Sequence, residues 1–369
     1  HGSSPFHRHT YRYSPLYILP HYAIATLSGG SVHDILAHIG TKVVWLVADG
    51  ATAAITLACL APATPTTTLP TWLPLATVSN VLAIQIAARG SPESLITVLT
   101  LTTVWLVLRC TASREARALA AGVILGLAIH LKLYPVLYVP IVAAALALGG
   151  SATAHDDCRS LLGRLRHRTT GRAIAIVAVL LGATILSTLA FTYLASAAID
   201  HDPAYIDEAF LYHVTRRDHR HNFSVYFYQL YLEAGEPGAS SSLLPFLPQA
   251  ACQLALLARF GGNMRAVPLH MFASTVIFVA LNKVCTVQYF VWYLVFVPLL
   301  VPLLQQRVSL GRVLVYAVAF ASTMGAWLGT GYLLEMRGQQ VYLAVFAASA
   351  AFFTAQLAIV LDMLVQADV

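Results

Sequence analysis

The amino-acid sequence predicts an all-α polytopic membrane protein. Of its 369 residues, 58% are hydrophobic and 10% are charged, whereas soluble domains carry about 25% charged residues. Uncharged runs extend over 173–199, 313–334 and 341–361. Each run is long enough to cross a bilayer as a helix, which takes roughly 20 apolar residues. The alternating pattern of a membrane β-barrel is absent, so helices that satisfy their own backbone hydrogen bonds are expected.

Apolar segments recur along the whole chain and predict about ten to eleven transmembrane helices in one multi-spanning domain over residues 1–369. Segment 69–88 is apolar too, but Pro70, Pro74 and Asn80 interrupt it. Because proline breaks a helix, we expect a half-helix there that does not cross the bilayer. The expected spans are 16–36, 42–60, 94–108, 117–131, 133–149, 172–199, 243–258, 267–281, 284–304, 312–334 and 340–363.

Basic loops predict which side of the membrane each end of a helix faces. Loop 155–172 contains five arginines, and short loops rich in Lys and Arg face the cytoplasm. Counting spans from this loop places 109–117, 259–266 and 305–312 on the cytoplasmic side as well. The net charge of +6 therefore reports topology rather than nucleic-acid binding. The polar segments 1–15, 86–94, 130–135, 200–242 and 282–289 then lie on the opposite side.

The densest polar segment runs from His213 to Ser224. It contains three arginines, three histidines and an aspartate within nine residues. Arginine clusters beside a membrane can hold a phosphate, because the guanidinium offers several donors to its oxygens. A solvated loop with ion pairs, or a zinc site on the histidines, is an alternative interpretation. Asn222 begins a formal glycosylation sequon, although a site role or no role is favoured over a glycan. The candidate residues are His213, Arg216, Arg217, Asp218, His219, Arg220, His221 and Asn222.

Further candidate binding residues lie at the ends of apolar segments on the same side. A lysine in such a place can extend to the lipid headgroups or bind an anionic lipid phosphate. Aromatic neighbours of these residues are typical of either an interface belt or a substrate groove. Ser91 and Glu93 are also typical of simple helix capping. The candidates are Arg12, Arg89, Glu93, His130, Lys132, Lys283 and Gln288.

Several other functional classes lack support in the sequence. The five cysteines form no CxxC pair, so free thiols are favoured over disulfides or a zinc site. No GxxxxGK[ST], GxGxxG or HExxH motif is present. Metal-binding residues are therefore not assigned, and ATP-driven transport and metalloprotease chemistry are not expected.

Five segments together resemble the catalytic subunit family of GPI mannosyltransferase I. These segments are TYRYSP (10–15), ARGSPESL (88–95), HLKLYP (130–135), YHVTRRDHRHNFSVYFY (212–228) and NKVCTVQYFVWY (282–293). They occur in the family's order, and the resemblance covers essentially the whole chain. TRRDHRHNFS is the most specific segment of the five.

The resemblance implies a GT-C-type glycosyltransferase in the endoplasmic reticulum membrane with a lumenal active site. Such an enzyme transfers the first α1,4-linked mannose from dolichyl-phosphate mannose to glucosaminyl-(acyl)phosphatidylinositol with inversion. The resemblance also implies a small accessory subunit, and it leaves open a divalent cation. Arg216, Arg217 and Arg220 would hold the donor phosphate. Asp218, His219 and His221 would be catalytic candidates that shape the site, and Lys132 and Lys283 would contact lipid phosphates.

The sequence departs from the family in one respect. The family carries an acidic DxD-type motif upstream of TYRYSP, and the chain is expected to lack this first lumenal loop and the helix before it. Asp200 and Asp202 have DxD spacing but lie in a different loop. Two other functions stay open: a membrane transporter, and an inactive truncated protein or scaffold. A transporter is expected to contain paired inverted repeats, and the sequence shows none.

Overall fold

The computed structural model describes residues 4–7, 11–27, 35–61, 73–149, 161–168, 170–216, 218, 220–234 and 246–367. The candidate residues Arg217 and His219 and the cysteine Cys158 lie outside these ranges, as does most of the basic loop 155–172. Within the described ranges the chain forms helices and turns and contains no β-strand. The predicted all-α class is therefore confirmed.

The packing of the helices divides the chain into two compact units. The first unit comprises His1–Val214 and Leu257–Pro268, and the second comprises Thr215–Leu256 and Leu269–Val369. The expectation of one multi-spanning domain over 1–369 stays a prediction.

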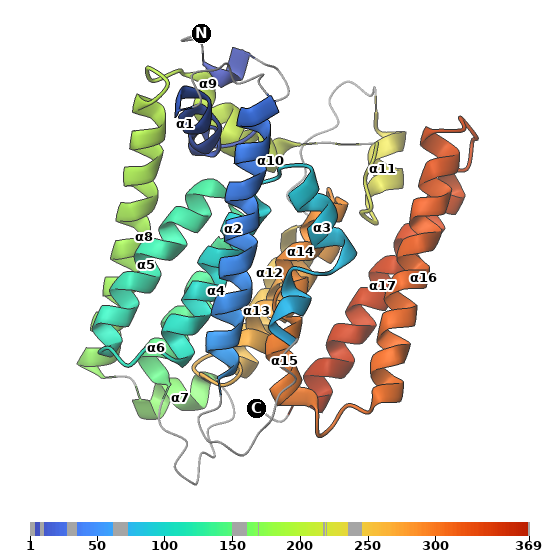
Figure 1. Cartoon of the computed structure of the whole chain (residues 1–369). Coiled ribbons are helices and arrows are strands. Elements are labelled where there is room, and N and C mark those ends of the chain that lie inside the picture. The colour runs from blue at the N-terminus through green and yellow to red at the C-terminus, as the bar shows by residue number, and fades with distance from the viewer. Residues whose placement is uncertain are drawn as a thin grey trace. The chain divides into compact units, whose positions relative to one another are not determined.

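The first unit is built around long helices whose small and apolar side chains face one another. Helices α5 and α8 run side by side over most of their length (Figure 1), and α2 packs on α4. The helices are α1 (Leu19–Leu27), α2 (Ile35–Leu60), α3 (Val81–Ala88), α4 (Glu93–Leu108), α5 (Arg114–Leu131), α6 (Tyr138–Leu148), α7 (Leu161–Arg168), α8 (Gly171–Ala197), α9 (Ala204–Ile206) and α10 (Tyr212–Thr215).

The second unit ends in a hairpin of two long helices, α16 (Leu310–Glu335) and α17 (Tyr342–Gln366), which lie side by side (Figure 1). Its aromatic core contains Phe223, Phe290 and Phe352, all of them buried. The other helices of this part of the chain are α11 (Phe227–Leu232), α12 (Phe246–Phe260), α13 (Val267–Ala280), α14 (Phe290–Leu294) and α15 (Val297–Leu304).

Four described helices are long and apolar enough to cross a membrane. They are Lys42–Leu60 within α2, then α8, α16 and α17, and a pair bent by 42°, Val287–Leu294 with Val297–Leu304, makes a fifth if it is one span. This confirms a polytopic membrane protein. At two other predicted spans, α4 and α13 are shorter apolar helices, with 16 and 14 residues. The count of ten to eleven crossings stays a prediction.

Two predicted segments, 69–88 and 16–36, can be compared with the helices that the structure describes. Segment 69–88 was expected to form a half-helix, and its described part consists of a 3₁₀ turn at Leu73–Thr77 and the eight-residue α3. Eight helical residues extend about 12 Å, which is too short to cross a bilayer. Of the expected span 16–36, the described residues form the end of a 3₁₀ turn at Pro15–Tyr17, then α1 up to Leu27 and the first two residues of α2, and residues 28–34 lie outside the described ranges.

Candidate functional site

The first polar site lies in the first unit, where α4 begins and α5 ends. Glu93 is the first residue of α4, and Lys132 is the residue that ends α5 with an extended backbone. Pro135 follows closely, and a proline cannot continue a helix. The Lys132 ammonium forms an ion pair with the Glu93 carboxylate, and their side chains are 10% and 1% exposed. The two predicted residues therefore meet as a nearly desolvated pair.

A chain of hydrogen bonds passes through His130 beside this pair. Its Nε2 lies 2.7 Å from the Ser14 hydroxyl oxygen, and its Nδ1 lies 3.1 Å from the Thr192 hydroxyl oxygen. His130 and Ser14 are both buried. A neutral imidazole has one donor and one acceptor nitrogen, and a hydroxyl can serve either. The contacts fix the ring between α8 and the TYRYSP segment.

The TYRYSP segment also places Arg12. Its guanidinium forms an ion pair with Glu208 and lies 4.3 Å from the centre of the Tyr212 ring. The Arg12 carbonyl oxygen lies 3.2 Å from His213 Nε2. The Lys132 ammonium lies 5.6 Å from the centre of the Tyr13 ring. The TYRYSP segment therefore contacts both the Arg12–Glu208 and the Glu93–Lys132 ion pairs.

Arg89 is less well connected. It ends α3, and its side chain is exposed. It lies four residues before Glu93, the first residue of α4. Its predicted binding role stays a prediction.

The second polar site lies in the second unit, on the segment that follows α10. Arg216 donates from Nε to the Asp218 carboxylate at 2.6 Å, with a second bond from Nη2. Arg220 donates to Glu335 at the end of α16, at 2.7 Å. His221 Nε2 lies 3.8 Å from the same carboxylate. The Arg220 and His221 side chains are 65% and 69% exposed, so both remain accessible from solvent.

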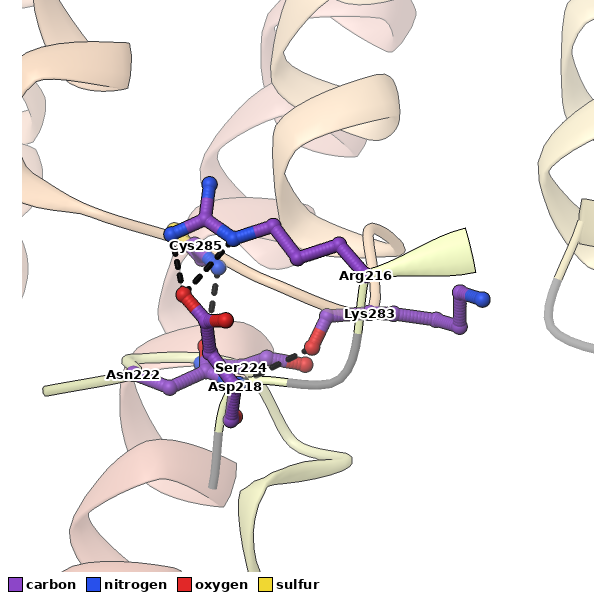
Figure 2. Close-up of polar contacts among 6 residues, drawn as sticks. All are labelled: Arg216, Asp218, Asn222, Ser224, Lys283 and Cys285. Atoms are coloured by element: carbon purple, nitrogen blue, oxygen red, sulfur yellow. Dashed lines mark hydrogen bonds and ion pairs between the residues drawn. The ribbon is translucent and has the colours of Figure 1, made fainter. Parts of the chain in front are cut away.

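The Asn222 side chain joins this segment to the NKVCTVQY segment, as Figure 2 shows. Its amide nitrogen donates to the carbonyl oxygens of Asp218 at 3.0 Å and Lys283 at 2.9 Å. Its amide oxygen accepts from the backbone N–H groups of Ser224 at 2.9 Å and Cys285 at 2.8 Å. Asn222 is 1% exposed. Two matched segments some sixty residues apart therefore meet at one buried amide.

The buried state of Asn222 leads to a prediction about glycosylation. The sequon Asn222–Ser224 is expected to carry no N-glycan in the folded protein, because a glycan needs an accessible amide nitrogen. Treatment of the purified protein with an N-glycosidase should leave its electrophoretic mobility unchanged. Ser224→Ala, which removes the sequon, should migrate like the unaltered protein. A mobility shift in either comparison would contradict this prediction.

Lys283 and Gln288 lie on the same segment. Lys283 is 8% exposed, and its ammonium lies 5.2 Å from the centre of the Phe246 ring at the start of α12. Gln288 lies in the 3₁₀ turn Val287–Tyr289 and is half-buried. The two residues thus share a short stretch of chain, and Lys283 is the more firmly held.

Sequence reasoning missed the residues that complete these contacts. Glu208, Glu335 and Thr192 supply partners to Arg12, Arg220 and His130. Glu335 could have been noticed, because an acidic residue that ends a long apolar helix is unusual. Thr192 carries no such signal within the apolar run of α8.

The structure gives no metal centre among the residues that it describes: no group of three His, Cys, Asp or Glu side chains in those ranges is placed to hold an ion. The zinc interpretation needed His219, which lies outside those ranges, and His213 and His221 belong to different units. A divalent cation thus stays a prediction. The four cysteines within the described ranges are free thiols, as expected.

Fold and sites together define a helical membrane protein whose polar residues gather in short segments at the ends of helices. The family model described as "Mannosyltransferase (PIG-M)" matches residues 86–364. The chain belongs to this mannosyltransferase family and is a glycosyltransferase.

Curated relatives agree with this assignment. The chain is 34% identical to the GPI alpha-1,4-mannosyltransferase I catalytic subunit of Danio rerio, over 95% of this chain and 81% of the relative. It is 33% identical to GPI mannosyltransferase 1 of Aspergillus oryzae, over 95% and 82% of the two chains. Its identity to GPI mannosyltransferase 1 of Saccharomyces cerevisiae is 32%, over 95% and 80%.

Proposed function

We propose that this mannosyltransferase transfers the first α1,4-linked mannose from dolichyl-phosphate mannose to glucosaminyl-(acyl)phosphatidylinositol in GPI-anchor biosynthesis. The observation that carries the proposal is the 34% identity to the Danio rerio catalytic subunit along almost the whole chain. The family membership does not favour a transporter or a scaffold. The donor is a sugar-phosphate lipid, which suits an enzyme whose helices are embedded in a membrane.

The proposed reaction inverts the configuration of the mannose anomeric carbon. The acceptor hydroxyl attacks this carbon, the bond to the phosphate oxygen breaks, and a carboxylate takes the hydroxyl proton. Negative charge then grows on the leaving dolichyl phosphate. Guanidinium and ammonium groups stabilise such charge where it develops.

The polar residues are proposed to have two kinds of role: some stabilise the charge of the donor phosphate, and others shape the site around it. Arg216, Arg217 and Arg220 bind the donor phosphate, while Asp218, His219 and His221 shape the surrounding site. The carboxylates that now pair with Arg216 and Arg220 hold those guanidinium groups in place before a phosphate arrives. The residues proposed to contact substrate elsewhere are Arg12, Arg89, Glu93, His130, Lys132, Lys283 and Gln288.

The proposed site faces the lumen of the endoplasmic reticulum, because the arginine-rich loops are expected on the cytoplasmic side. A small accessory subunit is the proposed protein partner. The name of the Danio rerio relative supports this partner, since it describes that protein as a catalytic subunit.

The test is a cell-free assay with membranes from cells that lack the endogenous GPI mannosyltransferase I and express the full-length protein. Labelled dolichyl-phosphate mannose should give glucosaminyl-phosphatidylinositol bearing one mannose. Label that enters only other lipids would leave a mannosyltransferase but overturn the proposed acceptor.

In the same assay, Arg217→Ala is expected to abolish mannose transfer while the protein still accumulates in the membrane. The expected reason is the loss of a guanidinium from the donor phosphate. Arg259→Ala is the matched control, because Arg259 lies in the last turn of α12, next to a loop expected on the cytoplasmic side, and its removal should leave transfer unchanged. Normal transfer by Arg217→Ala would contradict the assigned role.

A further inference from the structure

We propose that Asn222 is a positioning residue, whose buried amide holds the Lys283 segment so that the Lys283 ammonium binds a lipid phosphate. This inference rests on the proposed function, which assigns Lys283 to a lipid phosphate. It replaces the direct substrate contact expected for Asn222 from the sequence with an action through a second residue.

The hydrogen-bonding capacity of Asn222 is fully used inside the protein. An amide side chain has two N–H donors and an oxygen with two acceptor positions. The donors reach the carbonyl oxygens of Asp218 and Lys283, and the oxygen accepts from the N–H groups of Ser224 and Cys285. At 1% exposure, the amide has no position left for a substrate oxygen.

The bonds matter because they hold two stretches of irregular backbone. Residues 220–224 and 282–286 are in bends and extended chain, where no helix pairs the peptide groups. Buried peptide groups need hydrogen-bond partners. Two further bonds join the same stretches: Phe223 N–H donates to the Cys285 carbonyl oxygen at 2.8 Å, and the Ser224 hydroxyl donates to the Asn282 carbonyl oxygen at 2.8 Å.

The Asn222 segment is itself anchored to the core of the second unit. Phe223 is 5% exposed, stacks on the Trp327 ring of α16 and contacts Phe290 and Phe352 edge-on or tilted. The Asn222 backbone is therefore held in place, because Phe223 cannot move without opening this aromatic cluster. The hydrogen bond from Asn222 to the Lys283 carbonyl oxygen then holds the backbone of Lys283 in place as well.

Lys283 is restrained both at its backbone and at the end of its side chain. Asn222 binds its carbonyl oxygen, and the ammonium lies 5.2 Å from the centre of the Phe246 ring. Figure 2 shows the side chain leading away from the Arg216–Asp218 pair. Lysine has a long, flexible stem, so an ammonium that must meet a phosphate loses affinity when its backbone is released. Asn222 is thus expected to act on substrate binding more than on turnover.

The experiment is a double-mutant cycle with Asn222→Ala, Lys283→Ala and the double variant in the full-length protein. KM and kcat are measured separately for dolichyl-phosphate mannose and for the glucosaminyl-phosphatidylinositol acceptor. Each single variant should raise one KM by at least about tenfold, as expected for a lost bond to a charged phosphate. The double variant should resemble Lys283→Ala alone, because coupled residues are not additive. The substrate whose KM rises identifies which lipid phosphate Lys283 binds.

Two further variants separate positioning from folding. Ser224→Ala leaves the four Asn222 bonds and removes the bond from the Ser224 hydroxyl to the Asn282 carbonyl oxygen, so its KM should rise less than that of Asn222→Ala. Asn222→Asp keeps the acceptor oxygen for Ser224 and Cys285 but loses both donated bonds. It also places a carboxylate oxygen against the carbonyl oxygens of Asp218 and Lys283. It should raise the same KM, measured on the folded fraction recovered by size-exclusion chromatography, so that poor accumulation is not counted as weaker binding.

The outcomes distinguish the inference from the proposed function. Additive effects of Asn222→Ala and Lys283→Ala would overturn positioning through Lys283, and so would equal KM values for Asn222→Asp and the unaltered protein. An unchanged KM for both lipids in Lys283→Ala would remove Lys283 from phosphate binding and overturn the inference with it. Mannose transfer by these variants would still support the proposed function.

Discussion

Replacement of Glu93 by Gln is expected to destabilise the first unit by about 3–5 kcal/mol, since removal of one partner from a buried ion pair leaves the other charge uncompensated. The carboxylate is 1% exposed and the paired Lys132 side chain 10% exposed, so water cannot take over the lost interaction. Thermal unfolding of the detergent-solubilised protein, followed by size-exclusion chromatography, should show a clearly lowered Tm.

A second variant separates the cost of an unpaired charge from the loss of a binding residue. The double variant Glu93→Gln/Lys132→Met removes both charges and should recover most of the lost Tm. If Lys132 also contacts a lipid phosphate, the double variant should be stable but slow in mannose transfer.

The exposed pair Glu115–Arg172, at 40% and 66% exposure, is the control, and Glu115→Gln should leave the Tm nearly unchanged. A Tm for Glu93→Gln equal to that of the unaltered protein would contradict a buried charge pair.

The helices of this protein could be predicted closely from the sequence. The uncharged run 173–199 lies within α8 except for its last two residues. The run 313–334 lies within α16, and the run 341–361 lies within α17 except for Val341, which precedes its first residue. Such runs report helix length directly, because a helix in lipid must satisfy its own backbone groups over the thickness of the bilayer. Prolines and Asn80 likewise marked the shortened α3, because the Asn80 side chain accepts a hydrogen bond at its first turn.

The pairing of the polar residues could not be predicted in the same way. Glu93 and Lys132 were separate candidates, and nothing in their local sequence joins residues at the start of α4 and the end of α5. Such contacts follow from how helices pack, and many packings are compatible with one hydropathy pattern. The internal hydrogen bonds of Asn222 could not be predicted either, because a sequon is a local pattern and says nothing of distant partners such as Lys283.

The contact between α5 and α8 explains how His130 and its hydrogen-bond partner Thr192 are brought together. Helix α5 approaches α8 closely at Gly122 and Gly126, and hydroxyl groups of α8 bond across the contact. Thr188 donates to the Gly126 carbonyl oxygen at 3.2 Å, and Ser187 donates to the Gly122 carbonyl oxygen at 3.4 Å. Small residues allow helix backbones to meet in this way in membranes. One turn further along, the same two helices carry His130 and Thr192, whose side chains are hydrogen-bonded.

Gly126→Val is therefore expected to separate α5 from α8 and to disable the enzyme. A Cβ at Gly126 would lie 2.7 Å from the Thr184 carbonyl oxygen and would overlap the Ser187 hydroxyl. Because the first of these atoms belongs to the α8 backbone, the contact cannot be relieved by a side-chain rotation alone. Overpacking of this kind costs about 1–3 kcal/mol or more, and we expect a lowered Tm together with loss of mannose transfer.

Gly182→Val is the matched control for this prediction. Gly182 also lies within α8, but a Cβ there would meet nothing within 4 Å, so the Tm and mannose transfer should be close to those of the unaltered protein. Gly126→Ala should fall between the two valine variants, because it adds one methyl group to the crowded contact while improving helix propensity. Equal Tm values for Gly126→Val and Gly182→Val would show that the α5–α8 contact does not depend on the missing side chain at Gly126.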